Sequence, residues 1–470
     1  MFEINTNYYQ RNYNITGTLK SNPVHNTQFA NVPFCSNTAA GFSSSAIGTA
    51  YKTPQTELRT KEEKEKYNYL TANLDKYAKK ELHKLLKNGT LLRNDSNDKT
   101  SVLDNLYKIS TTPRFEGLDN NVILKETVNT LANPHLITQQ FGDIPQAYQA
   151  EALKLYAENN QEVNLSTANL IAKSVAQSNI NLEHSGTCVA ASIEFNLAQK
   201  NPAEFARFAE NLTSPDMAVK KEIRLDNLAD NVLDAFWLLN AFEVPFDAKD
   251  FNKATLTFAP DKNAVFRAKI QNSNRDEGER SVIDVLMQST LMQIGSQQTY
   301  DTLTDTRKGK FNQSDKGLIE FEKTFTESVV EDKNKISVTY QIVDENARIT
   351  GYETDFNTMK KQIISALSLG ENVIIGYTLT DTTNKIINGH EITITGVKQD
   401  SSGKIIFICN DTDDNHTGAI MYSEDYLLPK IHHAALPQVV IADEVNIVEN
   451  WVEGLRAYKQ LKQHSYKMTA

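Results

Sequence analysis

The order of helical and strand patterns along the chain constrains its fold more than any other feature of the sequence. Helical patterns predominate between about residues 56 and 300, whereas the segments that follow alternate in period two. The alternating segments are 324–345, 371–380 and a hairpin pattern formed by 391–397 and 404–410. A helical part followed by antiparallel strands predicts an α+β fold.

Composition and pattern divide the chain into regions. Residues 1–55 are rich in Asn, Ser and Thr and have few aliphatic side chains, so they cannot offset the entropy lost on ordering. We interpret them as a flexible leader, with a targeting or delivery segment as the alternative. Residues 56–175 are expected to be an α-helical region that opens with one long amphipathic helix from Thr56 to Gly89. A C-terminal helix or tail is expected at 441–470.

Charge and cysteine content exclude several classes of protein. The net charge of −10 comes from scattered acidic residues, and the chain has no cluster of Lys and Arg that would bind nucleic acid or an anionic membrane. Three cysteines in 470 residues cannot form a disulfide framework, and their spacing fits no zinc site. We therefore expect no metal ion and no organic cofactor.

Targeting signals are equally sparse. No run approaches the 18 or so apolar residues of a membrane span, so no span is expected. The N-terminus lacks a basic start followed by an apolar stretch, which argues against an ordinary secretory signal. The expected location is the cytoplasm, or outside the cell by a route without a cleaved signal peptide.

One cysteine stands in a position suited to nucleophilic chemistry. Cys188 follows the turn residue Gly186 and opens a helical stretch that ends near Asn201 and Pro202. The first N–H groups of a helix lack intrahelical acceptors and its dipole is positive there, so a thiolate is stabilised at this position. Taken alone, the pattern also fits an ordinary buried cysteine.

A histidine opens the first strand of the late hairpin. His390 shares its parity with Ile392, Ile394 and Gly396, which are apolar or small, whereas the residues between them are polar. Because alternate side chains of a strand point to opposite faces, we expect this imidazole to face the packed side of the sheet.

Two residues at the end of the second hairpin strand are candidates to orient the imidazole. If the loop covers residues 399–403, position 390 lies opposite 412, and Asn410 is the diagonal neighbour on the same face. A loop one residue shorter or longer reverses the parity and brings Asp411 to that face instead. Either residue can fix the tautomer of His390, and the sequence leaves both open.

This order of residues resembles the papain-like cysteine peptidase superfamily, in which a cysteine heads a helix and a histidine begins a strand. The closer resemblance is to bacterial peptidases of the bacteriocin-processing (double-glycine peptidase-like) type. It rests on the stretch from Ala366 to Tyr377, on Gly389-His390 through Gly396, and on Asn410-Asp411, and covers about residues 175–435.

The resemblance implies a papain-like domain at 176–440, in which a helical part carrying Cys188 packs on an antiparallel sheet carrying His390 and Asn410 or Asp411. Nucleophile and base are 202 positions apart, which leaves room for an insertion, expected to be helical, at about 215–310. The family usually has a Gln about six residues before the cysteine as oxyanion donor, but Leu182 stands there. Asn181 and Gln177 are the nearby amides, beside the Cys188 backbone N–H.

The implied activity is a cysteine peptidase acting on a peptide or protein substrate through a thioester. One alternative keeps the same residues for deamidation, transglutamination or other acyl transfer on a partner protein. The other is an inert papain-like scaffold that binds partners through its helical region.

Other motifs are interpreted more simply. Residues 411–415 resemble the opening of a calcium loop, but His416 and Tyr422 replace the required Gly and Glu, so an acidic turn is expected. His184 lies too close to Cys188 along the chain to serve as its base. His416, His432 and His433 are expected to be exposed loop histidines.

Overall fold

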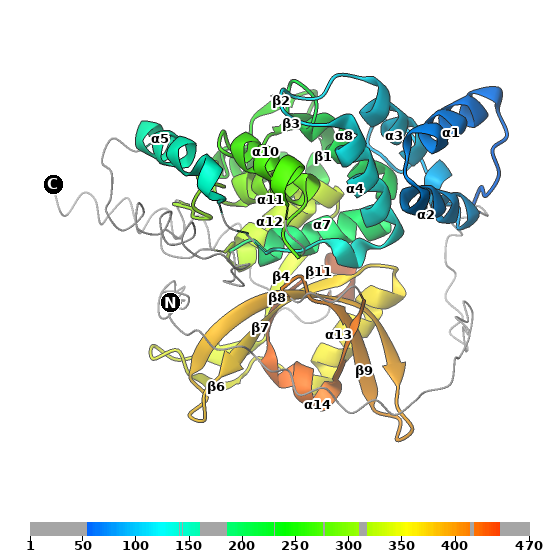
Figure 1. Cartoon of the computed structure of the whole chain (residues 1–470). Helices are drawn as coiled ribbons and strands as arrows, with labels where there is room; N and C mark the ends of the chain where they lie inside the picture. The colour runs from blue at the N-terminus through cyan, green and yellow to red at the C-terminus, as the bar shows by residue number, and fades with distance from the viewer. Residues whose placement is uncertain are drawn as a thin grey trace.

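The computed structural model describes residues 54–140, 142, 144–159, 186–229, 231–275, 278–309, 317–413 and 418–441. They form a helical layer that lies above a strongly curved antiparallel sheet (Figure 1). The α+β class predicted from the sequence is confirmed. The expected leader at 1–55 falls almost entirely outside the described residues, and the expected C-terminal helix or tail does so beyond 441.

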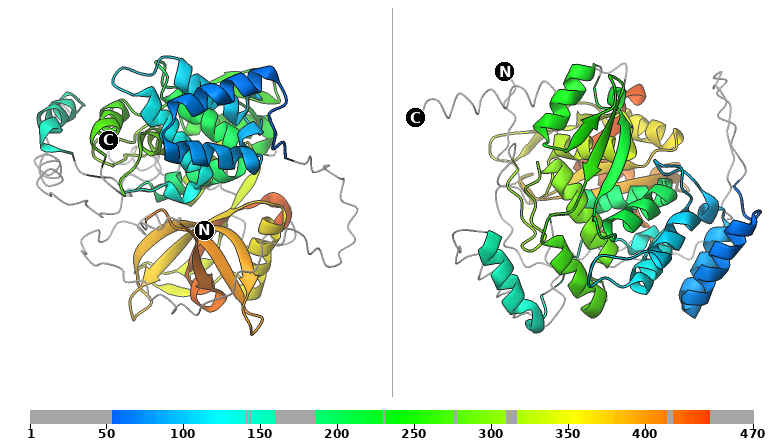
Figure 2. Two further views of the ribbon diagram at one scale, coloured as in Figure 1. Left: turned by 45° about the vertical axis from the view of Figure 1, so that its right-hand side comes forward. Right: turned by 90° about the horizontal axis from the view of Figure 1, so that it is seen from above.

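The helical layer contains most of the helices of the described chain. They are α1 (Lys61–Asn73), α2 (Lys76–Lys87), α3 (Val102–Thr111), α4 (Asn120–Ala132), α7 (Cys188–Lys200), α8 (Pro202–Leu212), α9 (Val232–Ala241), α10 (Ala264–Asn274), α11 (Val282–Gly295) and α12 (Glu320–Glu331). Helix α5 (Gln149–Asn159) stands apart at the edge of this layer (Figure 2). None of the described helices combines the length and apolarity needed to cross a membrane.

The single long helix predicted between Thr56 and Gly89 is wrong, because the chain breaks into α1 and α2. Leu74 is extended, and the Asp75 side chain accepts the Ala78 N–H at 2.9 Å, which caps a new helix. Leu70 and Leu74 are both buried even so. The break turns α2 toward α4, against which it packs.

The sheet layer begins after α12. Its six-stranded sheet has the order β10-β9-β8-β7-β11-β4, with neighbours antiparallel, and a separate hairpin pairs β5 with β6. The elements are β4 (Lys335–Thr339), β5 (Gln341–Val343), β6 (Ile349–Tyr352), α13 (Phe356–Ser368), β7 (Val373–Thr380), β8 (Ile386–Gln399), β9 (Ile405–Asn410), β10 (Ile420–Ser423), α14 (Glu424–Leu427) and β11 (Ile431–Pro437).

The strand pattern predicted from residue 324 was wrong over its first third. Residues up to Glu331 belong to α12, whose Phe325, Val329 and Val330 recur at helical spacing and are buried. Glu327 on this helix is buried although it is charged, because it forms an ion pair of 2.8 Å with the equally buried Lys335 of β4.

Two of the hydrophobic clusters among the described residues form the cores of the helical layer and of the sheet layer. One includes residues of α1–α4 together with α7, α8, α11 and α12, so the N-terminal helices and the Cys188 helix share a single core. The other lies between the sheet and α13. Strand β7 contributes to both, because Ile374 faces the helical core and its neighbours Val373 and Ile375 face the second.

The insertion expected at about 215–310 is helical only in part. It also contains a three-stranded antiparallel sheet with the order β1-β3-β2, formed by β1 (Val219–Arg224), β2 (Phe246–Ala248) and β3 (Lys253–Phe258). Strand β1 alternates buried and more exposed residues, which is the half-buried pattern of a sheet packed on one side.

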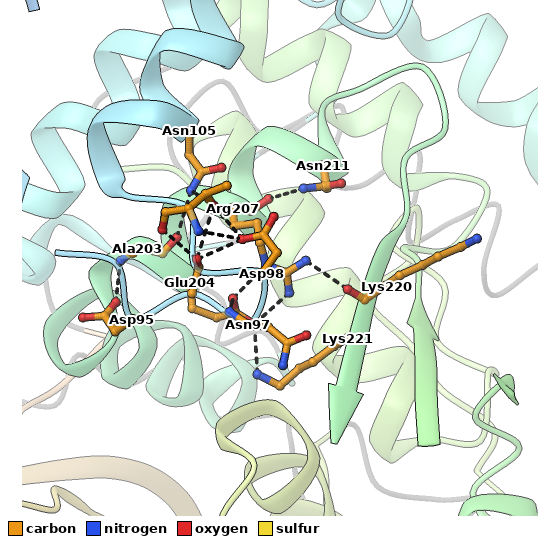
Figure 3. Close-up of polar contacts among 12 residues, drawn as sticks. Asp95, Asn97, Asp98, Asn105, Ala203, Glu204, Arg207, Asn211, Lys220 and Lys221 are labelled. Atoms are coloured by element: carbon orange, nitrogen blue, oxygen red, sulfur yellow. Dashed lines mark hydrogen bonds and ion pairs between the residues drawn. The ribbon is translucent and has the colours of Figure 1, made fainter. Parts of the chain in front are cut away.

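A buried ionic network attaches this insertion to the N-terminal helices. Glu204 of α8 accepts hydrogen bonds from Arg207, from Lys221 of β1 and from the backbone N–H of Asn97 (Figure 3). Helix α8, strand β1 of the insertion and the N-terminal segment around Asn97 therefore meet at the carboxylate of Glu204.

Candidate active site

Cys188 is the first residue of α7, directly after Thr187 at the N-cap. Its side chain is half-buried and packs against the helical core. Hydrogen bonds fix the turn before Cys188. The Gly186 N–H donates to Asp305 Oδ2 at 3.0 Å, and the Tyr300 hydroxyl donates to the other carboxylate oxygen of Asp305 at 2.5 Å. The sulfur is thereby presented at the helix tip, where unpaired N–H groups and the helix dipole stabilise negative charge.

His390 lies on β8, which packs against α7. Its ring lies beside the side chains of both Cys188 and Asp411, and both contacts raise its pKa. Nε2 of the ring lies 2.7 Å from Asp411 Oδ1. Its neighbour on β7, Tyr377, meets the ring edge-on with 5.7 Å between ring centres. The hydrogen bond to Asp411 and the contact with Tyr377 therefore orient the imidazole beside Cys188.

The charge state of His390 follows from these contacts. Burial lowers the pKa of His390, but the negative charge of Asp411 and the hydrogen bonds to Asp411 and Cys188 outweigh it and hold the pKa well above its ordinary value. These contacts favour the protonated imidazole, whose positive charge lies beside the sulfur of Cys188.

The hairpin register decides between the two candidates for the orienting residue. Near the turn Gln399 lies opposite Ile405, but the register shifts between Ile394 and Gly396, so that Ile394 lies opposite Cys409. This β-bulge puts one extra residue into β8 and reverses the parity beyond it. Asp411, not Asn410, therefore meets His390.

Asn410 has a different partner. Its Oδ1 lies 2.6 Å from Nδ1 of His135, a residue just after α4. Burial lowers the pKa of His135, in part offset by this hydrogen bond. The imidazole of His135 is accordingly neutral at neutral pH, with its Nδ1–H donating to Asn410.

Residues that the sequence did not single out hold the loop that carries Asp411. The Gln139 N–H donates to the Thr412 carbonyl at 3.0 Å, and Gln140 Nε2 donates to the Asp413 carbonyl at 2.7 Å. No local sequence pattern indicates this role for residues 135–140, because their hydrogen-bond partners lie more than 270 positions away in the sequence. Asp411 Oδ1 contacts His390 and accepts the Asp413 N–H, and Asp413 Oδ1 accepts from Gln139, while positions 414 and 415 of the 411–415 motif lie outside the described residues.

Asn181 and Gln177, the expected oxyanion donors, lie outside the described residues, as do His184 and His416. Within the described residues, the first-turn backbone N–H groups of α7 are in position to serve as oxyanion donors, since such groups have no acceptor within the helix.

His432 and His433 are not exposed loop residues as predicted. Both are buried on β11, which runs between β7 and β4 under α12. His432 Nε2 lies 2.9 Å from Glu320 Oε1, and the possible ligand atoms of Glu320, His432 and His433 lie within 4.8 Å of one another. This is the group of described residues able to hold a metal ion.

A buried cation already accompanies this cluster. Lys323 donates to Glu391 Oε2 at 3.1 Å, and Glu391 Oε1 lies 3.3 Å from His433. Burial and the charges of Lys323 and His432 hold the pKa of His433 well below its ordinary value. An added metal ion would meet the repulsion of Lys323, so the cluster is better described as an ion-pair network that joins α12 to the sheet.

Comparison of the chain with protein-family models, with curated proteins and with solved structures found no match. The functional argument accordingly rests on the geometry of the site.

Proposed function

We propose that this chain is a papain-like cysteine hydrolase, most directly a peptidase, with Cys188 as nucleophile, His390 as general acid and base, and Asp411 as the residue that orients His390. The observation that carries the proposal is the contact between a helix-tip cysteine and an imidazole that is itself hydrogen-bonded to a carboxylate. Cys188 and His390 are 202 residues apart in sequence, so local chain geometry does not bring them together.

The proposed reaction is acyl transfer in two steps. The Cys188 thiolate attacks the carbonyl carbon of the substrate, and the first-turn N–H groups of α7 stabilise the oxyanion. His390 gives its proton to the leaving amine, and a thioester remains. His390, now neutral, takes a proton from water, which attacks the thioester and releases the acid. Asp411 stabilises the imidazolium and fixes its orientation throughout.

The test compares the wild-type chain with Cys188→Ala. Each is incubated with a peptide library and, separately, with an excess of tagged Cys188→Ala chain as the protein substrate, and the products are read by mass spectrometry. We expect cleavage products from wild type only, because the variant lacks the nucleophile but loses only one small half-buried side chain. A change in side-chain mass without cleavage would identify deamidation or acyl transfer at the same site. Equal turnover by Cys188→Ala would refute the proposal.

A second measurement needs no substrate. Iodoacetamide should alkylate Cys188 at about pH 6, where an ordinary thiol with a pKa near 8.5 is largely protonated and unreactive. Cys409 serves as the internal control, since it is buried and burial raises the pKa of its thiol. An inert scaffold would show no rate enhancement at Cys188 over a model thiol.

A further inference from the structure

The residue proposed to orient His390 lies beyond the end of its strand. Strand β9 ends at Asn410 and β10 begins at Ile420, so Asp411 is the first residue outside the sheet ladder. Ladder hydrogen bonds therefore do not fix its carboxylate. Within the loop, Asp411 Oδ1 accepts the Asp413 N–H at 3.0 Å. Contacts from outside the loop are still needed to keep this turn 2.7 Å from His390, because ordering a loop costs conformational entropy.

The holding contacts come from residues 135–140, which we call the clasp. Besides the two backbone contacts already described, Gln139 Nε2 donates to Asp413 Oδ1 at 2.8 Å, and Thr412 Oγ1 donates to Gln139 Oε1 at 3.3 Å. With His135 bonded to Asn410, the clasp touches the residue before Asp411 and the two after it.

The other side of the clasp is tied to the helix that carries Cys188. Gln288 of α11 donates through the same Nε2 to the Thr138 carbonyl at 2.9 Å and to Glu194 Oε2 at 3.0 Å. Glu194 belongs to α7, and so does Phe195, whose ring centre lies 5.2 Å from that of His135. Gln288, Thr138, Glu194 and Phe195 are buried, whereas His135 and Asp413 are half-buried.

We propose that the clasp is a positioning element of the active site, which sets Asp411 in register with the nucleophile helix. This inference rests on the function proposed above for Cys188, His390 and Asp411. The clasp follows α4, so it belongs to the N-terminal helical region rather than to the part of the chain that carries the three reacting residues. The N-terminal region is thus required for a correctly assembled site, and is more than an attached partner-binding part.

The clasp acts through the charge state of His390. If Asp411 loses its position, its carboxylate stabilises the imidazolium less, and the thiolate paired with that imidazolium is stabilised less in turn. The rate at which iodoacetamide alkylates Cys188 should then fall most at low pH. A purely structural contact would lower stability without moving this pH dependence.

The test uses the full chain and measures the rate of iodoacetamide alkylation of Cys188 at about pH 6 and about pH 9. Gln139→Met keeps side-chain length and the backbone bond to Thr412 but removes the side-chain bonds to Thr412 Oγ1 and Asp413 Oδ1. His135→Phe keeps the ring against Phe195 but removes the bond to Asn410. We expect the ratio of the rate at pH 6 to the rate at pH 9 to fall about three- to tenfold in both variants, since a displaced carboxylate forfeits part of a pKa effect of about 1–3.

Gln362→Met is the matched control. Gln362 of α13 is about as buried as Gln139, at 5% against 1% exposure, and accepts a hydrogen bond of 2.8 Å from Tyr340 on the far side of the sheet. It should lose comparable thermal stability but keep the wild-type rate ratio within about twofold. If Gln139→Met fails to fold, His135→Phe decides the question.

The possible failures are distinguishable. If wild-type Cys188 shows no enhanced alkylation at about pH 6, the proposed function fails. If wild type shows it and the clasp variants keep the wild-type ratio, only the inference about the clasp is overturned. The same holds if Gln362→Met lowers the ratio as much as Gln139→Met does.

Discussion

Replacement of Glu204 by Gln should destabilise the folded chain by an amount that the structure specifies. Glu204 is 2% exposed and accepts two hydrogen bonds from Arg207, each of 2.8 Å, one of 2.9 Å from Lys221 and one of 2.8 Å from the Asn97 N–H. Burial alone would raise the pKa of Glu204, but these bonds and the charges of Arg207 and Lys221 lower it to about 2.

The magnitude follows from the linkage between protonation and folding. A difference between the ordinary pKa of 4.5 and the folded-state pKa of about 2 corresponds to about 3.4 kcal/mol, at about 1.36 kcal/mol for each pKa unit. The folded-state pKa is depressed, so this stabilisation is fully present above about pH 4.5 and is lost as the pH falls toward 2. Breaking a buried ion pair by removing one partner typically costs about 3–5 kcal/mol, which agrees.

The assay is guanidinium unfolding of wild type and Glu204→Gln, followed by far-UV circular dichroism across a series of pH values. At neutral pH the variant should be less stable by about 3 kcal/mol, and the difference should shrink as the wild-type carboxylate becomes protonated below about pH 4.5. The control is Glu222→Gln on β1, because Glu222 pairs with Lys253 at 2.5 Å while both side chains are almost half exposed. That change should stay within about 0.5 kcal/mol.

Two outcomes would refute this reasoning. One is a difference below about 1 kcal/mol at neutral pH, which would mean that the network contributes little beyond the desolvation it requires. The other is a difference that does not decrease in acid, which would mean that the charge of Glu204 is not what stabilises the fold.

Two further predictions concern the sheet. Asp411→Asn keeps a hydrogen-bond acceptor for His390 but removes the charge that raises the pKa of His390. Activity should therefore fall about tenfold or more, and the alkaline limb of the pH–rate profile should move to lower pH by about 1–3 pH units. An unshifted limb would exclude Asp411 as the electrostatic partner of His390. Gly376→Ala on β7 would place a Cβ 2.2 Å from the buried ring of His433, so it should cost about 1–3 kcal/mol by overpacking, as measured by thermal or chemical unfolding. Gly396→Ala on β8 is the control, because the atom nearest to its new Cβ is Ile408 Cδ1 at 3.8 Å. The stability of this variant should stay within about 1 kcal/mol of wild type. Equal losses of stability at both glycines would contradict the packing argument.

Local patterns predicted several elements of the site well. A glycine turn before a helical stretch indicated that Cys188 stands at a helix start, and strict alternation indicated that His390, Ile392 and Ile394 share a face. Both signals are read over fewer than ten residues, and backbone sterics within such a window are largely independent of the rest of the chain.

The same local reasoning failed where burial was decided by distant residues. Glu391 was expected to lie on the polar side of its strand, yet it is buried, because Lys323 of α12 neutralises it from the helical layer. His432 and His433 were expected in a loop, but they lie on an inner strand covered by that same helix.

The sequence by itself determined the α+β class and the identity of the cysteine and histidine candidates, because helical and strand periodicities are properties of neighbouring residues. Only the tertiary structure decided that Asp411 rather than Asn410 meets His390. That choice depends on a β-bulge in β8 and on hydrogen bonds from residues 135–140, more than 270 positions away. A shift of one residue in strand pairing moves every side chain of the strand to the opposite face of the sheet. The sequence of the hairpin alone does not select the pairing register before the helical layer packs against the hairpin.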